Sequence, residues 1–117
     1  MGEAILRGIL RAGKLSPSQV LASDVRSDAL ADLANRYGIR TTTDNLGAAH
    51  AATVILVCVK PHQVGAVLNT DAMREALGGK VVISIAAGVR LQQLAHWLPA
   101  SALIRAMPNT PPSSAKA

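Results

Sequence analysis

The chain has 117 residues, a formal net charge of +5 and 50% hydrophobic residues, with one cysteine, one tryptophan, one tyrosine and no phenylalanine. This length allows one modest domain. The single cysteine excludes an internal disulfide and is consistent with a reducing, cytoplasmic location. The basic residues form no cluster and two aromatic residues cannot make a base-stacking platform, so we expect no nucleic-acid partner. No apolar run approaches the ~20 residues that cross a bilayer, so we expect no membrane partner.

The first half of the chain alternates helical and β-type patterns. A helix is predicted over residues 2–12, with Gly13 as its stop and Gly8 placed for close approach to a strand. Glu3 lies four residues before Arg7, a spacing that favours an ion pair on one helix face. The elements that follow are a strand over 19–23, a helix over 26–37 that ends at Gly38, a β segment over 39–42 and a short helix over 44–52.

The second half is built around an unbroken apolar run from Val54 to Val59. Such a run is typical of a central parallel strand with both faces covered. Lys60 and Pro61 end it, because proline fixes φ and lacks a backbone donor. The remaining predicted elements are one broken or two short helices over 62–69 and 71–77, a strand over 80–85, a helix over 91–98 and a strand over 103–107. This alternation predicts an α/β fold with a Rossmann-like doubly wound parallel sheet.

Four loops follow the carboxyl ends of the predicted strands, at residues 23–26, 43–45, 59–61 and 86–88. Ligands of doubly wound sheets bind at this edge, so these loops are the candidate site. The three histidines share no ligand spacing with one another or with an acid cluster. We therefore expect no metal site.

Four motifs in these loops and near the chain's end carry a resemblance: TTDN at 42–45, VKP at 59–61, SIAAG at 84–88 and MPNTP at 107–111. In order and spacing they resemble the N-terminal NADP-binding domain of pyrroline-5-carboxylate reductase. The resemblance covers nearly all of the chain, and SIAAGV followed by IRAMPNTP is its most specific part. It implies an oxidoreductase of proline biosynthesis that uses NADPH to reduce a small-molecule substrate, 1-pyrroline-5-carboxylate, to L-proline.

The resemblance also implies which residues bind the cofactor. Ser23 and Arg26 match positions near the adenosine ribose and its phosphate, and Asn45 matches a position at the adenosine end. The segment 58–61 matches the pyrophosphate and ribose contacts, and the segment 86–88 flanks the nicotinamide. A guanidinium suits a 2′-phosphate, and small residues let a flat ring approach the backbone. The implied cofactor-binding residues are Gly2, Ser23, Arg26, Asn45, Cys58, Val59, Lys60, Pro61, Ala86, Ala87 and Gly88.

Several of these residues have a second interpretation. Arg26, in the first turn of a helix, could be solvated surface. Asp24, at a strand end, would accept ribose hydroxyls and favour NAD, so NAD is the alternative to NADP. Cys58 is interpreted as a buried small hydrophobe rather than a nucleophile. Asn109, within MPNTP, is either a turn former or part of a substrate-side loop. No residue is assigned a catalytic role, because the cofactor carries the hydride.

The resemblance further divides the chain into a partial dinucleotide-binding domain over 1–110 and the start of a linker over 111–117. The strand and glycine turn that open such domains are not seen, and Met1-Gly2 matches only the end of that turn. The helical C-terminal domain, which in the family forms the dimer and holds the substrate carboxylate, is not seen either. We therefore expect an inactive fragment that binds NADPH weakly. The alternatives are another NADP-linked imine or ketone reductase and a non-catalytic fragment.

Overall fold

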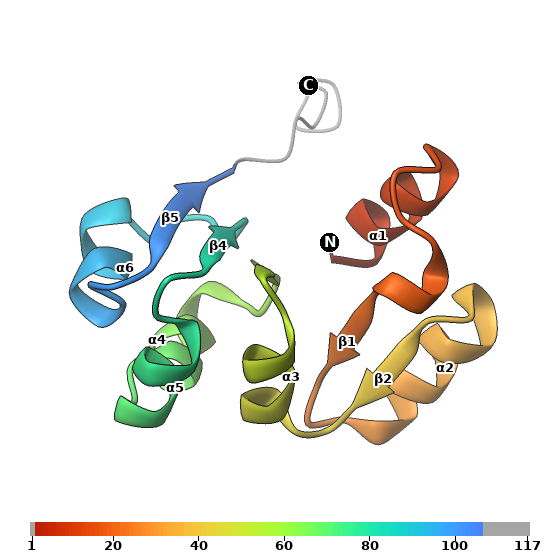
Figure 1. Cartoon of the computed structure of the whole chain (residues 1–117), viewed down its shortest axis with the longest axis horizontal. Coiled ribbons are helices and arrows are strands. Elements are labelled where there is room, and N and C mark those ends of the chain that lie inside the picture. The colour runs from red at the N-terminus through yellow and green to blue at the C-terminus, as the bar shows by residue number, and fades with distance from the viewer. Residues whose placement is uncertain (1, 107–117) are drawn as a thin grey trace. The chain divides into compact units, whose positions relative to one another are not determined.

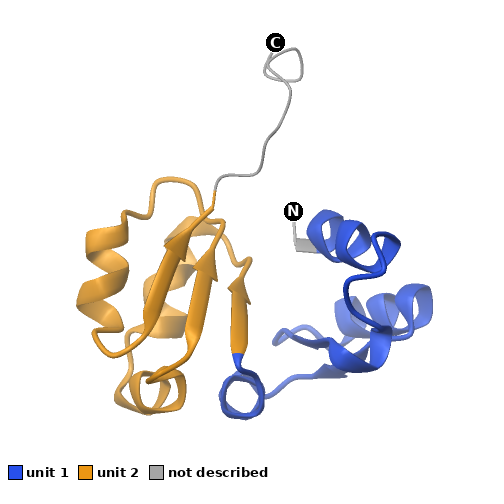
Figure 2. Ribbon diagram, turned by 45° about the horizontal axis from the view of Figure 1, so that its top comes forward, with its two compact units in different colours: residues 1–53 blue, residues 54–117 orange. Residues whose placement is uncertain are grey.

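A computed structural model of the chain describes residues 2–106. The chain forms two compact units, residues 1–53 and 54–117, each with its own parallel sheet (Figure 2). The predicted Rossmann-like α/β class is confirmed, since helices and parallel strands alternate along the chain. None of the described helices is long and apolar enough to cross a membrane.

The first unit is a two-stranded parallel sheet with helices (Figure 1). Its elements are α1 (Gly2–Arg11), the 3-10 helix η1 (Pro17–Gln19), β1 (Leu21–Ser23), α2 (Ser27–Tyr37), β2 (Arg40–Thr42) and α3 (Asn45–Ala51). Leu21 of β1 lies opposite Arg40 of β2, and Ser23 lies opposite Thr42. Helix α2 packs against β2 and α3 packs against β1. Leu30, Ile39 and Ala49 form the buried core of this unit.

The ends of these helices follow local signals in the sequence. Gly38 ends α2 in the left-handed region, with φ 70°, and its N–H donates to the Ala34 carbonyl at 2.9 Å. Glycine is the residue that takes this conformation without steric cost. Asp44 begins α3 by accepting the N–H of Gly47 at 3.0 Å, which satisfies one of the backbone donors exposed at a helix start.

The expectations for α1 were met only in part. The Glu3 carboxylate makes its direct contacts with α2, accepting from Arg36 Nη1 and Tyr37 Oη, each at 2.8 Å, while Arg7 acts on it through its charge. The hydrogen bond from Tyr37 is the largest cause of a lowered Glu3 pKa. Gly8 makes no close approach, since a Cβ built there meets nothing within 4 Å. The contacts of Glu3 depend on α2, which helical spacing within α1 cannot reveal.

The second unit is a three-stranded parallel sheet in the order β3-β4-β5. Its elements are β3 (Val54–Val57), α4 (Pro61–Leu68), α5 (Asp71–Leu77), β4 (Val81–Ser84), α6 (Leu91–Trp97) and β5 (Ala102–Arg105). Val57, Ser84 and Arg105 lie in register at the carboxyl ends of the three strands. The interruption between α4 and α5 is confirmed as two helices, because Thr70 Oγ1 caps α5 by accepting the Met73 N–H at 3.1 Å.

The core of the second unit lies between its sheet and its helices. Leu77 and Leu94 are fully buried, and so is the hydroxyl-bearing Ser84. Ser84 Oγ accepts the Ala86 N–H at 3.3 Å, which satisfies this buried polar group. The other buried residues of this unit are Val57, Val64, Leu68, Met73, Ala76, Val82, Ile85, Ala86, Val89 and Leu98.

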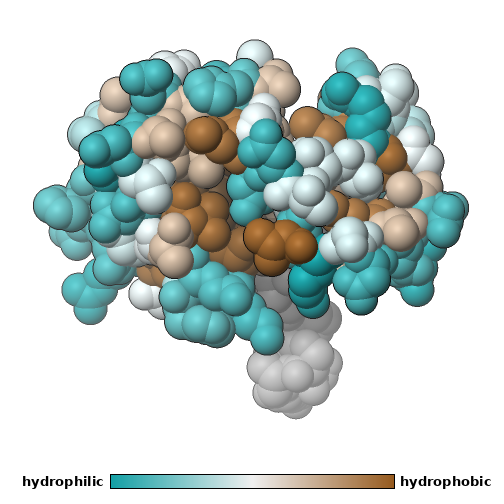
Figure 3. Space-filling view, turned by 90° about the horizontal axis from the view of Figure 1, so that it is seen from below, coloured by the Kyte–Doolittle hydropathy of each residue, from teal (hydrophilic) through white to brown (hydrophobic). Residues whose placement is uncertain are grey.

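The expectation that the run 54–59 forms a central strand was wrong for this chain. Among the described residues β3 is an edge strand that pairs only with β4, and β4 is the central strand. Val54 is 57% exposed and Leu56 36% exposed. Ile104, which shares their sheet face through the register, is 50% exposed. Apolar surface of this kind is drawn brown among the hydrophilic residues in Figure 3. The apolar run correctly indicated a strand but not which of its faces is covered.

Two glycines provide a matched test of these backbone assignments. Gly38→Ala should lower the free energy of unfolding by about 1–2 kcal/mol, because an alanine resists the left-handed φ of 70°. Gly8→Ala should raise it by about 0.5–1 kcal/mol, because α1 gains helix propensity and the new Cβ meets nothing within 4 Å. Urea unfolding followed by circular dichroism measures both. Shifts of the same sign would contradict the assigned helix end.

Candidate functional site

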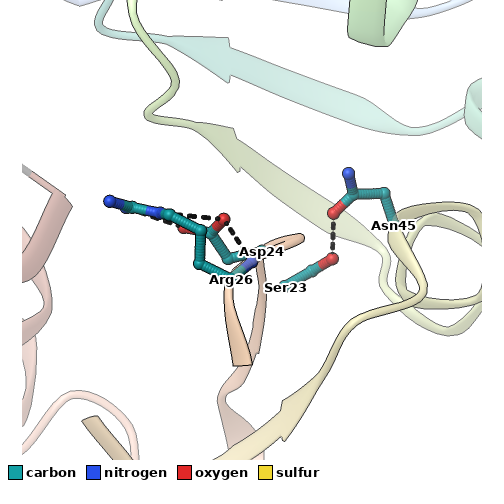
Figure 4. Close-up of polar contacts among 4 residues, drawn as sticks. All are labelled: Ser23, Asp24, Arg26 and Asn45. Atoms are coloured by element: carbon teal, nitrogen blue, oxygen red, sulfur yellow. Dashed lines mark hydrogen bonds and ion pairs between the residues drawn. The ribbon is translucent and has the colours of Figure 1, made fainter. Parts of the chain in front are cut away.

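The loop after β1 carries three of the polar residues of the candidate site. Ser23 ends the strand, and its hydroxyl donates a hydrogen bond to Asn45 Oδ1 at the start of α3 (Figure 4). The structure thus brings together Ser23 and Asn45, which are 22 residues apart in the sequence. The bond joins the carboxyl end of β1 to the amino end of the helix that follows β2.

Asp24 and Arg26 pair with each other in the same loop. The backbone N–H of Arg26 donates to Asp24 Oδ1 at 3.1 Å, and its Nη2 donates to Asp24 Oδ2 at 3.1 Å. The hydrogen bond from the Arg26 side chain is the largest cause of a lowered Asp24 pKa, so the carboxylate is ionised at neutral pH. The Arg26 side chain is 71% exposed. Its guanidinium is therefore both open to solvent and already engaged, and the contact with a phosphate stays a prediction.

A hollow of about 450 Å³ lies in the second unit, where the loop after β4 meets helices α4 and α6. Three residues predicted for the site line it, namely Pro61, Ala87 and Gly88. The lining is completed by His62, Gly65, Val89, Gln93 and Trp97. The carboxyl-edge rule therefore found the loop after β4 and the first residue of α4, whereas Val89 and the remaining residues, which lie in the helices, were missed.

The missed wall of the hollow depends on a contact between two helices. A Cβ on Gly65 of α4 would lie 3.0 Å from Cζ2 of Trp97, so the glycine lets the indole of α6 pack against the α4 backbone. These residues are 32 positions apart and no local pattern links them. The chain's single tryptophan was the one available signal, because large aromatic side chains commonly line ligand pockets.

The segment 86–88 is shaped by burial at one end and by a glycine at the other. Ala86 is 5% exposed and its N–H is held by Ser84 Oγ at 3.3 Å. Ala87 and Gly88 are exposed, and Gly88 has φ 80° with nothing within 4 Å of a Cβ built on it. The backbone at Gly88 is therefore open, and the approach of a flat ring to this segment stays a prediction.

The segment 58–61 departs from its prediction at one residue. Cys58 is exposed, so its interpretation as a buried hydrophobe was wrong; it follows β3, which is an edge strand. Desolvation by nearby atoms nevertheless raises the pKa of its thiol, which leaves it protonated at neutral pH and a weak nucleophile. Val59 is half-buried, and Lys60 is exposed at the start of α4, whose first residue is Pro61.

The remaining predicted residues lie at the ends of the chain. Gly2 is the first residue of α1. Asn109 lies outside the described residues. Among residues 2–106, no group of three or more His, Cys, Asp or Glu side chains could hold a metal ion.

Comparison with known proteins gives both sequence and fold relatives. The family model described as NADP oxidoreductase, coenzyme F420-dependent, matches residues 1–88. The pyrroline-5-carboxylate reductase of Methanosarcina acetivorans is 37% identical over 110 residues, which cover 93% of this chain and 40% of that protein. The Escherichia coli K12 enzyme of the same name is 36% identical over 119 residues, covering 95% of this chain and 41% of that protein.

Two solved structures share the fold. The pyrroline-5-carboxylate reductase of Coxiella burnetii superimposes with a TM-score of 0.84 at 34% identity, covering 97% of this chain and 42% of that one. The Plasmodium falciparum pyrroline carboxylate reductase, solved with NADP bound, superimposes with a TM-score of 0.78 at 24% identity, covering 93% of this chain and 38% of that one.

These relatives confirm the resemblance inferred from the motifs in the strand-end loops. The chain spans about 40% of the length of the curated relatives that it matches. The family match covers more than half of the chain and includes every described residue predicted for the site. The chain therefore belongs to the NADP oxidoreductase family described as coenzyme F420-dependent, and it shares its fold with pyrroline-5-carboxylate reductases.

Proposed function

We propose that this chain is the cofactor-binding part of a reductase that uses NADPH to convert 1-pyrroline-5-carboxylate to L-proline. The observation that carries the proposal is the 36–37% identity to pyrroline-5-carboxylate reductases along 93–95% of the chain. A relative with NADP bound shares the fold, and the matching family is one of NADP oxidoreductases. The proposal therefore names NADPH as the cofactor, with NADH as the alternative.

The residues at the end of β1 fit the adenosine half of such a dinucleotide. A hydroxyl, a carboxamide and a guanidinium are gathered there on Ser23, Asn45 and Arg26. Ribose hydroxyls pair with the first two groups, and a 2′-phosphate pairs with the third in a charge-assisted hydrogen bond. These side chains would hold and orient the cofactor rather than take part in bond making.

The residues beside the hollow fit the nicotinamide half. Pro61, Ala87 and Gly88 offer little side chain, so a flat ring could lie against the backbone, and the Trp97 indole forms another wall. When bound, NADPH supplies the hydride that reduces the imine carbon. The chain's own part in the reaction is to fix the ring and keep one of its faces from solvent. We assign no catalytic residue within the chain.

The proposal includes a cellular location and an oligomeric state. We place the reaction in the cytoplasm, in keeping with the single cysteine. The family resemblance implies a helical domain beyond the matched residues. We assign to that domain the binding of the substrate carboxylate and the pairing of subunits into a homo-oligomer. Nucleic acids and membranes have no role in this proposal.

A second candidate is another NADP-linked reductase of imines or ketones. The description of the matching family names NADP and coenzyme F420 but not 1-pyrroline-5-carboxylate, which favours keeping this candidate. A non-catalytic fragment that binds nothing tightly is a third. Turnover with defined substrates separates the three.

Fluorescence of the single tryptophan tests the position of the cofactor. NADPH should quench Trp97 emission, since the indole lines the same hollow as Ala87 and Gly88. Gly88→Ala should weaken NADPH binding about tenfold, because its Cβ enters the space proposed for the ring. Gly79→Ala is the matched control, since Gly79 also has a positive φ of 76° but precedes β4 at the opposite end of the strand. Equal losses in both variants would contradict the proposed position.

A chimera tests the reaction. Residues 2–110 of this chain would replace the matching part of the Escherichia coli reductase, which is 36% identical. We expect NADPH oxidation that depends on added 1-pyrroline-5-carboxylate and that needs about tenfold more NADPH in the Gly88→Ala chimera. A folded chimera whose Trp97 emission responds to NADPH, but which turns over only other imines or ketones, would support the second candidate instead. A folded chimera that turns over none of these substrates would support the third candidate, the non-catalytic fragment.

A further inference from the structure

Two side chains lie just after β1, Asp24 and Arg26, and they indicate opposite preferences for a dinucleotide with or without a 2′-phosphate. In sheets of this type an acid at such a strand end accepts the ribose 2′-hydroxyl of an unphosphorylated dinucleotide. An arginine near the same place accommodates a 2′-phosphate instead. Asp24 and Arg26 are two residues apart, so this chain carries both signals in one loop.

The structure shows that the two groups are engaged with each other. Arg26 Nη2 lies 3.1 Å from Asp24 Oδ2, and Arg26 Nε lies 3.5 Å from Asp24 Oδ1. The guanidinium thus turns its Nε and Nη2 edge towards the carboxylate, while its far end points away from Asp24 (Figure 4). Five N–H donors belong to a guanidinium, so donors remain for a second anion.

A 2′-phosphate that binds Arg26 would compete with Asp24 for the guanidinium. Such a phosphate would accept hydrogen bonds from the same Arg26 N–H groups as the Asp24 carboxylate does. It would also be repelled by the negative charge of that carboxylate. Both side chains are open to water, at 71% and 33% exposure, so the ion pair is weak and can open. Once it opens, the released carboxylate can accept a ribose hydroxyl.

We propose that Asp24 sets the choice of dinucleotide by holding Arg26, so that the chain accepts both unphosphorylated and 2′-phosphorylated forms with only a small preference for the phosphorylated one. This rests on the proposed function, since it takes the end of β1 as the adenosine site. Asp24 is a positioning residue, because it affects the phosphate by holding the guanidinium of Arg26.

A merely structural role for Asp24 can be separated from this one. Asp24 Oδ1 also accepts the backbone N–H of Arg26 at 3.1 Å and so shapes the loop. An asparagine keeps an acceptor oxygen for that N–H but removes the charge. Asp24→Asn therefore alters the electrostatics of the pair with little change to the loop's backbone contact.

The experiment titrates adenosine 2′,5′-bisphosphate and adenosine 5′-monophosphate, which differ only in the 2′-phosphate, into the ¹⁵N-labelled chain. Amide shifts of residues 23–26 and 45 report binding even when it is weak. In the Asp24→Asn protein we expect the bisphosphate to bind about fivefold more tightly and the monophosphate more weakly. In the Arg26→Ala protein we expect the bisphosphate to lose about tenfold, while the monophosphate binds as well as before or better.

Asp28→Asn is the matched control. Asp28 is exposed in the first turn of α2 and acts on Arg26 through its charge, so the variant makes the same change in net charge as Asp24→Asn. We expect it to change both ligands little and in the same direction. If Asp24→Asn weakens the binding of both ligands, or changes the binding of neither, the proposed role of Asp24 is overturned while the adenosine site itself still stands. If neither ligand shifts these amides in the unaltered chain, the proposed adenosine site fails as well.

Discussion

The candidate site depends on the parallel register of the two sheets. Parallel strands end at one edge, so segments far apart in the sequence leave their sheet side by side. Ser23 and Thr42 are in register in the first unit, and Val57 and Ser84 are in register in the second. The polar loop after β1 therefore lies near the start of α3, and the loop after β3 lies beside the segment 86–88. A shift of either register would separate these groups without changing any one of them.

Much of this arrangement could be predicted because its signals are local. Gly38 ends a helix through its own φ of 70°, Pro61 begins one after a strand, and Thr70 caps the next. Residues of these kinds act within one turn of chain, so the predicted bounds lie within two residues of those observed. The strand-end loops followed in turn, because the rule that places ligands at the carboxyl edge needs only the order of strands and helices.

The rest could not be predicted because it depends on contacts between distant residues. Glu3 could be matched by spacing only to Arg7, whereas it binds Arg36 and Tyr37 of another helix. Gly65 is needed for the indole of Trp97, which follows it by 32 positions. The exposure of Cys58 follows from the place of β3 at the edge of its sheet, and an apolar run does not report strand order.

The end of β1 and the segment 86–88, each taken within its own unit, differ in their chemistry. A phosphate is recognised by charge. An exposed ion pair such as Asp24–Arg26 contributes little stability on its own, so its charges can be changed by substitution at little cost to the fold. A flat ring needs space beside the backbone, and Ala87 and Gly88, which line the hollow, carry almost no side chain. Space of this kind is not adjustable, because at a φ of 80° the backbone of Gly88 tolerates few other residues. Substitutions at the end of β1 can therefore change the charge of an exposed loop, whereas Gly88 can be replaced by few residues without backbone strain.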